Sequence, residues 1–185
     1  MNTFLLFDNN QTSNVLKLLS RQLYGLVSSA EKLAIIGLLR RGAPLADLIK
    51  KHFLEYGYNH EILRFDLKVK HYTDDLVVLH PNVLLTIDDQ SFIPNLTGYT
   101  AIIIDDVIYT GETALTVIHY LKSKSPANIY LAALVDRLGH KVPIAANVIG
   151  KYIQINEHSA IECHVPPFEP RLQIVLSNIP IPVNS

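Results

Sequence analysis

One stretch of the sequence decides the fold: Ala101-Ile102-Ile103-Ile104-Asp105-Asp106-Val107-Ile108-Tyr109-Thr110-Gly111-Glu112-Thr113. Its pattern predicts a buried strand that ends in two carboxylates, followed by a loop of small residues that opens a helix. Loop amides and a helix amino terminus suit a phosphate, whereas carboxylates at a strand end suit sugar hydroxyls or a hydrated magnesium ion. The stretch therefore predicts a ligand with phosphate, ribose and metal. The alternative is a helix cap, Thr110 or Thr113, beside a solvated acidic pair.

Helical and strand patterns alternate in the segment that precedes this stretch. Ser13-Asn14 is the expected cap of an amphipathic helix. A short buried strand over 33–37 and a connecting loop over 38–43 follow. Pro44 is expected at the first position of the next helix, where its missing N–H does no harm. This part of the chain therefore predicts a helix, a strand and a second helix in succession.

Residues 62–69 alternate between apolar and polar side chains, which predicts a half-exposed strand. From Lys70 to Pro94 we expect a polar segment with strand character around Leu76–Leu79 and Val83–Ile87. No internal repeat, low-complexity segment or linker divides the 185 residues, so a single domain is expected.

Beyond the opening stretch, the spacing of apolar residues predicts a helix stopped by Pro126 and another buried strand over 129–135. The recurrence of strand, helix and strand predicts an α/β fold with a mainly parallel sheet flanked by helices. Ligands of such sheets bind beyond the carboxyl ends of the strands. The loops 37–42, 105–113 and 136–141 all emerge at that edge.

The composition excludes several classes of protein. A net charge of −1 provides no general attraction to nucleic acid, and no apolar run approaches the ~20 residues of a membrane span. The first residues lack the basic region of a signal peptide, so we expect a cytoplasmic protein without a membrane partner. The lone Cys163 excludes an internal disulfide framework, and a packed thiol is favoured over a nucleophile.

A second candidate site lies in the loop Gly37-Leu38-Leu39-Arg40-Arg41-Gly42, which follows one strand and precedes a helix. Its amides and arginines can hold a diphosphate, because arginine offers donors in a fixed bidentate geometry. The alternative is a pair of solvated arginines in an ordinary loop.

The opening stretch resembles the phosphoribosyl diphosphate (PRPP) signature of type I phosphoribosyltransferases: an apolar run, two acidic residues and a Thr-Gly-x-Thr loop. The resemblance implies that Asp105 and Asp106 hold the ribose hydroxyls and that the loop holds the 5′-phosphate. Arg41-Gly42 matches the family's pyrophosphate loop, commonly Gly-x-x-x-Arg-Gly. Catalytic roles are expected for Asp105, Asp106 and Arg41. The implied PRPP-binding residues are Arg40, Arg41, Gly42, Asp105, Asp106, Val107, Tyr109, Thr110, Gly111, Glu112 and Thr113.

The later sequence resembles the PyrR group of this family, which are pyrimidine-operon attenuation regulators that also act as uracil phosphoribosyltransferases. The resemblance is carried by Leu134-Val135-Asp136-Arg137, Pro143-Ile144, Val148-Ile149-Gly150-Lys151 and Tyr72-Thr73-Asp74-Asp75-Leu76, and it spans roughly residues 33–151. It implies a magnesium-dependent enzyme that makes UMP and diphosphate from uracil and PRPP, and a homodimer or higher homo-oligomer. The implied base-binding residues are Asp136, Arg137, Val148, Ile149 and Lys151.

The resemblance also implies the layout of the chain. We expect one type I phosphoribosyltransferase domain over 1–185, with a flexible arm at about 68–94 and a small hood built from 1–12 and 143–185. Within the arm, the ligand-contacting candidates are Lys68, Lys70 and His71. No direct metal-ligand set is expected; Asp105 and Asp106 are expected to hold Mg²⁺ through water.

Several departures from the group's pattern leave alternatives open. Thr73 stands where the group has arginine, so the arm lacks one expected contact to the pyrophosphate. Ala145, Asn147 and the stretch 138–141 also differ, which weakens the prediction of RNA binding more than that of PRPP binding. One alternative is a nucleotide-sensing RNA regulator with little catalysis, binding RNA through Arg137, His140, Lys141 and Lys151. Another is a phosphoribosyltransferase for a purine base.

Overall fold

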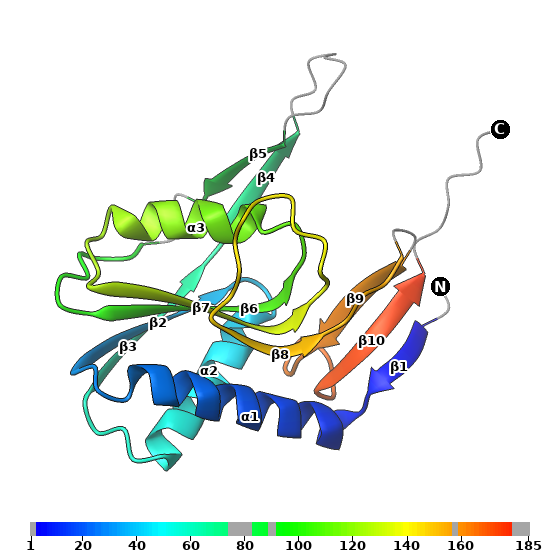
Figure 1. Cartoon of the computed structure of the whole chain (residues 1–185), viewed down its shortest axis with the longest axis horizontal. Helices are drawn as coiled ribbons and strands as arrows, with labels where there is room; N and C mark the ends of the chain where they lie inside the picture. Colours follow the sequence, from blue (N-terminus) through cyan, green and yellow to red (C-terminus); the bar gives the residue numbers. More distant parts are fainter. Residues whose placement is uncertain (1–2, 74–82, 89–91, 157–158, 179–185) are drawn as a thin grey trace.

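A five-stranded parallel sheet forms the centre of the protein, with the strand order β3-β2-β6-β7-β8 (Figure 1). The computed structural model describes residues 3–73, 83–88, 92–156 and 159–178. The strands of this main sheet are β2 (Lys32–Leu38), β3 (Glu61–Leu67), β6 (Thr100–Ile108), β7 (Asn128–Asp136) and β8 (Val148–Tyr152). The predicted α/β fold with a mainly parallel sheet is confirmed.

Helices cover both faces of the main sheet (Figure 1). Two apolar clusters result: Ile102 and Ile104 of β6 pack in the cluster of α1 and α2, whereas Ala101 and Ile103 pack in that of α3. Because successive strand residues point to opposite faces, a strand covered on both sides must be apolar throughout. This explains why residues 101–104 of β6 are all apolar. The helices are α1 (Asn9–Val27), α2 (Gly42–Glu55) and α3 (Glu112–Lys122).

Both early helices begin sooner than the sequence pattern indicated. Asp8 caps α1 by accepting from the Gln11 amide at 2.8 Å, while the Gln11 side chain accepts from the Asp8 amide at 2.9 Å. The expected cap at Ser13 is wrong; its hydroxyl donates to the Asn9 carbonyl inside the helix. Pro44 is the third residue of α2 rather than the first, and its missing N–H remains harmless because the first turn has no acceptor for it.

A second, antiparallel sheet has the order β1-β10-β9, and we call it the small sheet. Its strands are β1 (Thr3–Phe7), β9 (Ser159–His164) and β10 (Gln173–Asn178). Residues 143–185, expected with 1–12 to form the hood, thus divide between two sheets, because β8 belongs to the main one. The small sheet reaches the carboxyl end of β6, where the Cys163 thiol of β9 donates to the Asp106 carbonyl at 3.6 Å. Cys163 is fully buried, as the packed-thiol prediction requires.

The expected arm contains a two-stranded antiparallel ribbon of β4 (Val69–Thr73) and β5 (Val83–Ile87) that projects from the body (Figure 1). Strand character at 83–87 is confirmed, whereas that expected at 76–79 lies outside the described residues. Lys68 precedes the ribbon, and its ammonium lies 3.5 Å from Asp88, which follows β5.

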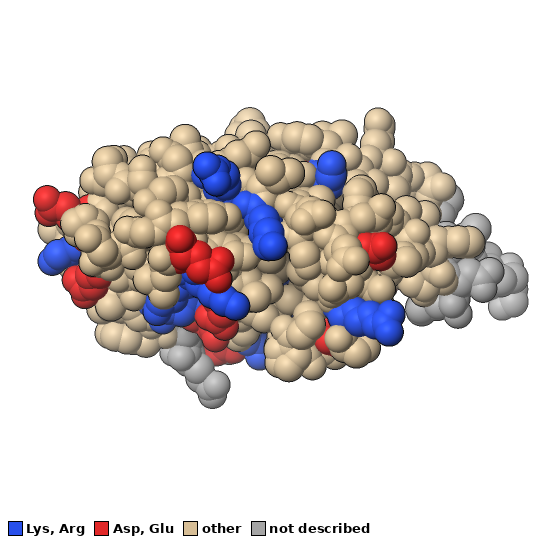
Figure 2. All heavy atoms as spheres, turned by 90° about the horizontal axis from the view of Figure 1, so that it is seen from below, with Lys and Arg blue, Asp and Glu red and all other residues tan. Residues whose placement is uncertain are grey.

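On the face along which α1 lies, acidic side chains are interspersed among the basic ones (Figure 2). Ion pairs such as Arg64–Asp47 at 2.8 Å and Lys51–Glu55 at 3.9 Å contribute to this mixing near α2. Among the residues that the structure describes, no helix is both long and apolar enough to cross a membrane.

The capping box at Asp8 generates a prediction about stability. Asp8→Ala removes the acceptor for the Gln11 amide, so we expect the free energy of unfolding in urea to fall by about 1 kcal/mol. Asp8→Asn keeps a side-chain acceptor and is the matched control, with a smaller expected loss. Equal stability of wild type and Asp8→Ala would contradict the importance of this cap.

Candidate functional site

Three loops meet at the carboxyl edge of the main sheet, because β2, β6 and β7 are parallel neighbours in register. The loop after β2 carries Arg40 and Arg41, the loop after β6 carries Tyr109 to Gly111, and the loop after β7 begins at Arg137. The structure therefore brings together segments that are separated by about 100 residues in the chain.

The acidic pair Asp105 and Asp106 lies at the carboxyl end of β6, half-buried. Burial raises the pKa of Asp105 well above its usual range, and the charge of Asp106 raises it further. Burial also raises the pKa of Asp106, although the hydrogen bond with Asp105 and the positive charge of Arg41 oppose the rise. Because the ionised pair is costly without partners, it favours a ligand that supplies hydroxyl donors or a cation.

The loop between β6 and α3 forms a small polar cavity of about 110 Å³ at the amino terminus of α3. Gly111 occupies the cap position with a φ of 84°, a left-handed conformation that glycine adopts without strain. The Thr110 hydroxyl lies 3.4 Å from the Glu112 amide, which donates to it. The amide groups at a helix amino terminus and the helix dipole make this cavity suitable for a phosphate. Its lining residues are Asp105, Val107, Ile108, Tyr109, Thr110, Gly111, Thr113 and Ala114.

The arginine loop, residues 39–42, packs directly against β6. A Cβ on Gly42 would lie 2.5 Å from the Ile104 carbonyl oxygen, so only glycine permits this approach. The approach places Arg40 and Arg41 around a cavity of about 200 Å³ that Asp106 completes. Arg40 and Arg41, which are expected to bind the diphosphate, are thus neighbours of the acidic pair. That these residues bind PRPP stays a prediction.

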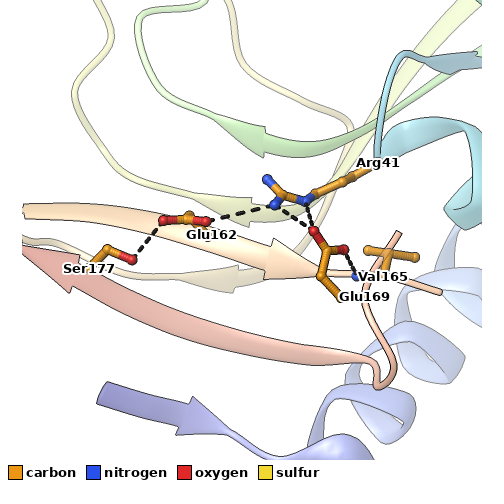
Figure 3. Close-up of polar contacts among 5 residues, drawn as sticks. All are labelled: Arg41, Glu162, Val165, Glu169 and Ser177. Carbon is orange, nitrogen blue, oxygen red and sulfur yellow. Dashed lines mark hydrogen bonds and ion pairs between the residues drawn. The ribbon is translucent and has the colours of Figure 1, made fainter. Parts of the chain in front are cut away.

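Arg41 is held by two carboxylates of the C-terminal segment, which the sequence reasoning missed (Figure 3). Its Nε and Nη2 donate to Glu169 Oε1 at 3.1 and 2.7 Å, and Nη2 lies 3.7 Å from Glu162 Oε2. Burial of Glu169 pushes its pKa upward, but the hydrogen bonds from Arg41 and from the Val165 amide outweigh this and lower the pKa. Neither glutamate stands in a motif, so no sequence signal marked them.

Arg137 stacks against Tyr109, which belongs to the loop between β6 and α3. The Arg137 guanidinium carbon lies 3.9 Å from the centre of the Tyr109 ring, and Nη2 donates to the Ser159 carbonyl at 2.9 Å. The Nε of Arg137 is buried, and no described residue supplies it with a hydrogen-bond acceptor. On another side, a Cβ on Gly139 would lie 2.0 Å from the Tyr109 ring. An aromatic ring and a guanidinium group lie together here, and such groups suit a planar base with carbonyl oxygens.

The other expected base-binding residues differ in exposure, from the buried Asp136 and Val148 to the exposed Lys151. Asp136 is buried and accepts from the Leu138 amide at 2.7 Å, and its Oδ1 lies 3.0 Å from His140 Nε2. Val148 is buried in the apolar cluster beneath α1, so its side chain belongs to the core. Ile149 packs against the opposite cluster. The Lys151 ammonium lies 5.8 Å from the centre of the Phe7 ring, on the side of the small sheet.

Of the arm candidates, Lys68 lines a cavity of about 570 Å³ that adjoins the arginine loop at Leu39. Lys68 and Asp88 line it together with Arg64, Asp66 and aromatic residues. Lys70 and His71 lie on β4, and their contacts with a ligand stay predictions.

The acidic pair fits Mg²⁺ better than it fits a metal that needs a full protein cage. No cluster of three or more His, Cys, Asp or Glu occurs among the described residues. Mg²⁺ keeps several waters and commonly takes one or two carboxylates plus phosphate oxygens. Asp105 and Asp106, which lie beside the arginine loop and the amino terminus of α3, meet that requirement.

Comparisons with known proteins agree with this site. The phosphoribosyl transferase domain family matches residues 6–167, so the chain belongs to this family. Its curated relatives include proteins named bifunctional protein PyrR. That of Fusobacterium nucleatum is 34% identical over 149 residues, covering 80% of this chain and 82% of that protein. That of Actinobacillus pleuropneumoniae is 28% identical over 93% of this chain and 95% of that protein. Both resemblances seen in the sequence, to type I phosphoribosyltransferases and to the PyrR group, are confirmed.

Solved structures confirm the fold. A hypoxanthine phosphoribosyltransferase from Trypanosoma cruzi superposes with a TM-score of 0.73 at 16% identity, covering 95% of each chain. Another, from Staphylococcus aureus, has a TM-score of 0.67 at 20% identity and covers 84% of this chain and 79% of that chain. The type I phosphoribosyltransferase fold is therefore shared across low sequence identity.

The raised pKa values of the acidic pair generate a prediction. Between the ordinary aspartate pKa of about 4 and the raised folded values, the folded protein binds more protons than the unfolded chain. Stability of the ligand-free protein therefore falls as pH rises through this window. We expect Asp105→Asn with Asp106→Asn to melt at an equal or higher temperature than wild type at about pH 7.5, and to lose that advantage near pH 4.

Melting curves from about pH 4 to pH 8 measure this difference. Asparagine at position 105 can still accept from the residue 106 amide, which in wild type donates to Asp105 at 2.9 Å, so local geometry is retained. A double variant that melts well below wild type at neutral pH would show instead that neighbouring groups stabilise the ionised pair.

Proposed function

We propose that this protein is a PyrR-like pentosyltransferase that moves the phosphoribosyl group of PRPP to a nucleobase. Uracil is the proposed base, which gives UMP and diphosphate, with Mg²⁺ as cofactor. One observation carries the proposal: the acidic pair, the amino terminus of α3 and the arginine loop surround one edge of the sheet. These parts match the ribose, the 5′-phosphate and the diphosphate of one molecule. A cytoplasmic homodimer or larger homo-oligomer is proposed from family resemblance.

The reaction breaks the bond between the ribose anomeric carbon and a diphosphate oxygen, and forms a bond from that carbon to a nitrogen of the base, which loses its proton. Positive charge develops on the ribose ring, and negative charge develops on the leaving diphosphate. Asp105 and Asp106 orient the ribose through its hydroxyls and place negative charge near the developing cation. Arg41 and the amides of the arginine loop stabilise the leaving group.

Mg²⁺, when bound, reduces the negative charge on the diphosphate oxygens. Asp105 and Asp106 would hold it, through water and alongside oxygens of the ligand. The chain itself supplies orientation and exclusion of water at the sheet edge. The ribbon of β4 and β5 stands next to the cavity that adjoins Leu39, so closure of this arm would shield the reacting carbon.

Two observations support uracil as the base. The curated relatives named bifunctional protein PyrR match over most of this chain. The guanidinium of Arg137, whose buried Nε has no acceptor among the described residues, lies next to the Tyr109 ring, and uracil presents carbonyl acceptors at its edge. A purine base is the alternative within the enzyme class, and comparative turnover separates the two.

A nucleotide-sensing RNA regulator is the second candidate, supported by the word bifunctional in the relatives' name. Two of the four residues proposed for RNA are engaged elsewhere: Arg137 with Tyr109, and His140 with Asp136. Lys141 and Lys151 are exposed. These contacts favour catalysis over RNA binding, since nucleic-acid affinity depends on basic groups that are free to reach phosphates.

A steady-state screen of PRPP consumption tests the proposal. With Mg²⁺ present, we expect uracil to yield UMP and diphosphate at a higher kcat/KM than orotate, hypoxanthine, guanine or xanthine. Asp105→Asn with Asp106→Asn should lower turnover by about 100-fold or more, because the ribose is no longer held in the reactive geometry. The variant's melting temperature verifies that it remains folded.

Faster turnover with a purine would replace uracil by that purine. Absence of turnover with every base would refute the enzyme, and salt-dependent, sequence-selective binding of a pyrimidine-leader RNA would then establish the regulator.

A further inference from the structure

The arginine proposed to hold the diphosphate already has two anionic partners within the protein. One edge of the Arg41 guanidinium, formed by Nε and Nη2, donates to a single oxygen of Glu169 (Figure 3). Glu162 lies against the same Nη2 at 3.7 Å. An anion that binds this edge of Arg41 must first displace the Glu169 carboxylate.

Both carboxylates are fixed by the C-terminal segment rather than left mobile. The second oxygen of Glu169 accepts from the Val165 amide at 2.8 Å, and Glu162 accepts from the Ser177 hydroxyl at 2.7 Å. The side chain of Glu169 is only 18% exposed, so solvent screens this pair less than it screens a surface pair. The arrangement is therefore a built contact between β9, the following loop and the arginine loop.

The contact extends to the neighbouring arginine. The guanidinium carbon of Arg40 lies 4.6 Å from the centre of the Phe168 ring. Two consecutive residues after β9, Phe168 and Glu169, thus engage the two consecutive arginines 40 and 41. Only the Glu169 contact competes directly with an anion, since the aromatic ring leaves the donors of Arg40 in the plane of the guanidinium.

The charges at this end of the cleft oppose a free polyanion. Two guanidinium groups, Arg40 and Arg41, stand against the carboxylates of Asp106, Glu162 and Glu169. A metal-free diphosphate brings several more negative charges to this place. A divalent cation bound to the diphosphate reduces that negative charge. The cation also attracts the Glu169 carboxylate that the diphosphate displaces from Arg41.

We propose that Glu169, assisted by Glu162, makes the arginine loop select diphosphate groups complexed with a divalent cation over the free anion, by competing for Arg41. This inference rests on the proposed function, in which the loop binds the diphosphate of PRPP. It adds the form of the ligand that the loop accepts and assigns that selection to the C-terminal segment.

Calorimetric titration of the full-length protein with inorganic diphosphate tests the inference, once in EDTA and once with excess Mg²⁺. Glu169→Gln keeps an acceptor for the Val165 amide but removes the charge. We expect its affinity for metal-free diphosphate to rise by about tenfold or more over wild type, the scale of one charged hydrogen bond. With Mg²⁺ the affinity should change by less than about threefold, so that the metal preference falls.

Two further variants serve as controls. Glu55→Gln on α2 makes the same change of net charge at an exposed residue whose ion-pair partner is Lys51, and it should leave both affinities unchanged. Glu162→Gln should lower the metal preference in the same direction as Glu169→Gln but by less, because its contact with Arg41 is longer. If Glu169→Gln fails to fold, Glu162→Gln alone decides the outcome.

Three results would overturn the inference. An unchanged metal preference in Glu169→Gln would show that the carboxylate does not discriminate between ligand forms. Weaker binding in both conditions would show that Glu169 instead positions Arg41 for the anion. No diphosphate binding by wild type in either condition would remove the diphosphate site itself, and with it the proposed function, whereas the first two results leave that function intact.

Discussion

The site depends on the close approach of two backbone segments, the arginine loop and the end of β6. Gly42 lies so near the Ile104 carbonyl that no side chain fits between them. This approach places guanidinium groups beside half-buried carboxylates whose pKa values are raised by burial. The parallel sheet makes the approach possible, because the ends of β2 and β6 lie side by side. The close approach of the arginine loop to β6 therefore determines both the packing of the core and the charges in the cleft.

The same geometry explains why the buried carboxylates of the cleft are costly to ionise without a ligand. Burial raises the pKa values of Asp105 and Asp106, so their ionised forms are costly, while Arg41 is paired with Glu169 and Glu162. A ligand that combines hydroxyls, a cation and a diphosphate exchanges partners with all of these groups at once. The strands β2, β6 and β7 are buried on both faces and form a stable core. This core holds charged groups of the site in half-buried positions that cost free energy.

The sequence contained the features with a local signature. The apolar runs of β2, β6 and β7, the acidic pair at the end of β6 and the loops that follow β2 and β6 could be predicted, since each depends on residues adjacent in the chain. The cap at Asp8 was missed because Ser13 offered an equally good pattern. The Glu169–Arg41 contact joins residues 128 positions apart and has no motif, so only the folded chain reveals it. Val148 carries a family pattern, yet core packing decides where its side chain lies.

The order of the strands also bears on how the protein is made. All five strands of the main sheet have been synthesised once the ribosome passes Tyr152, but β10 is the central strand of the small sheet and comes last. A nascent chain can thus assemble the carboxyl edge of the main sheet while Arg41 still lacks the carboxylates of residues 162 and 169. The contact of Arg41 with Glu162 and Glu169 consequently forms late in biosynthesis, after the strands of the main sheet have been synthesised.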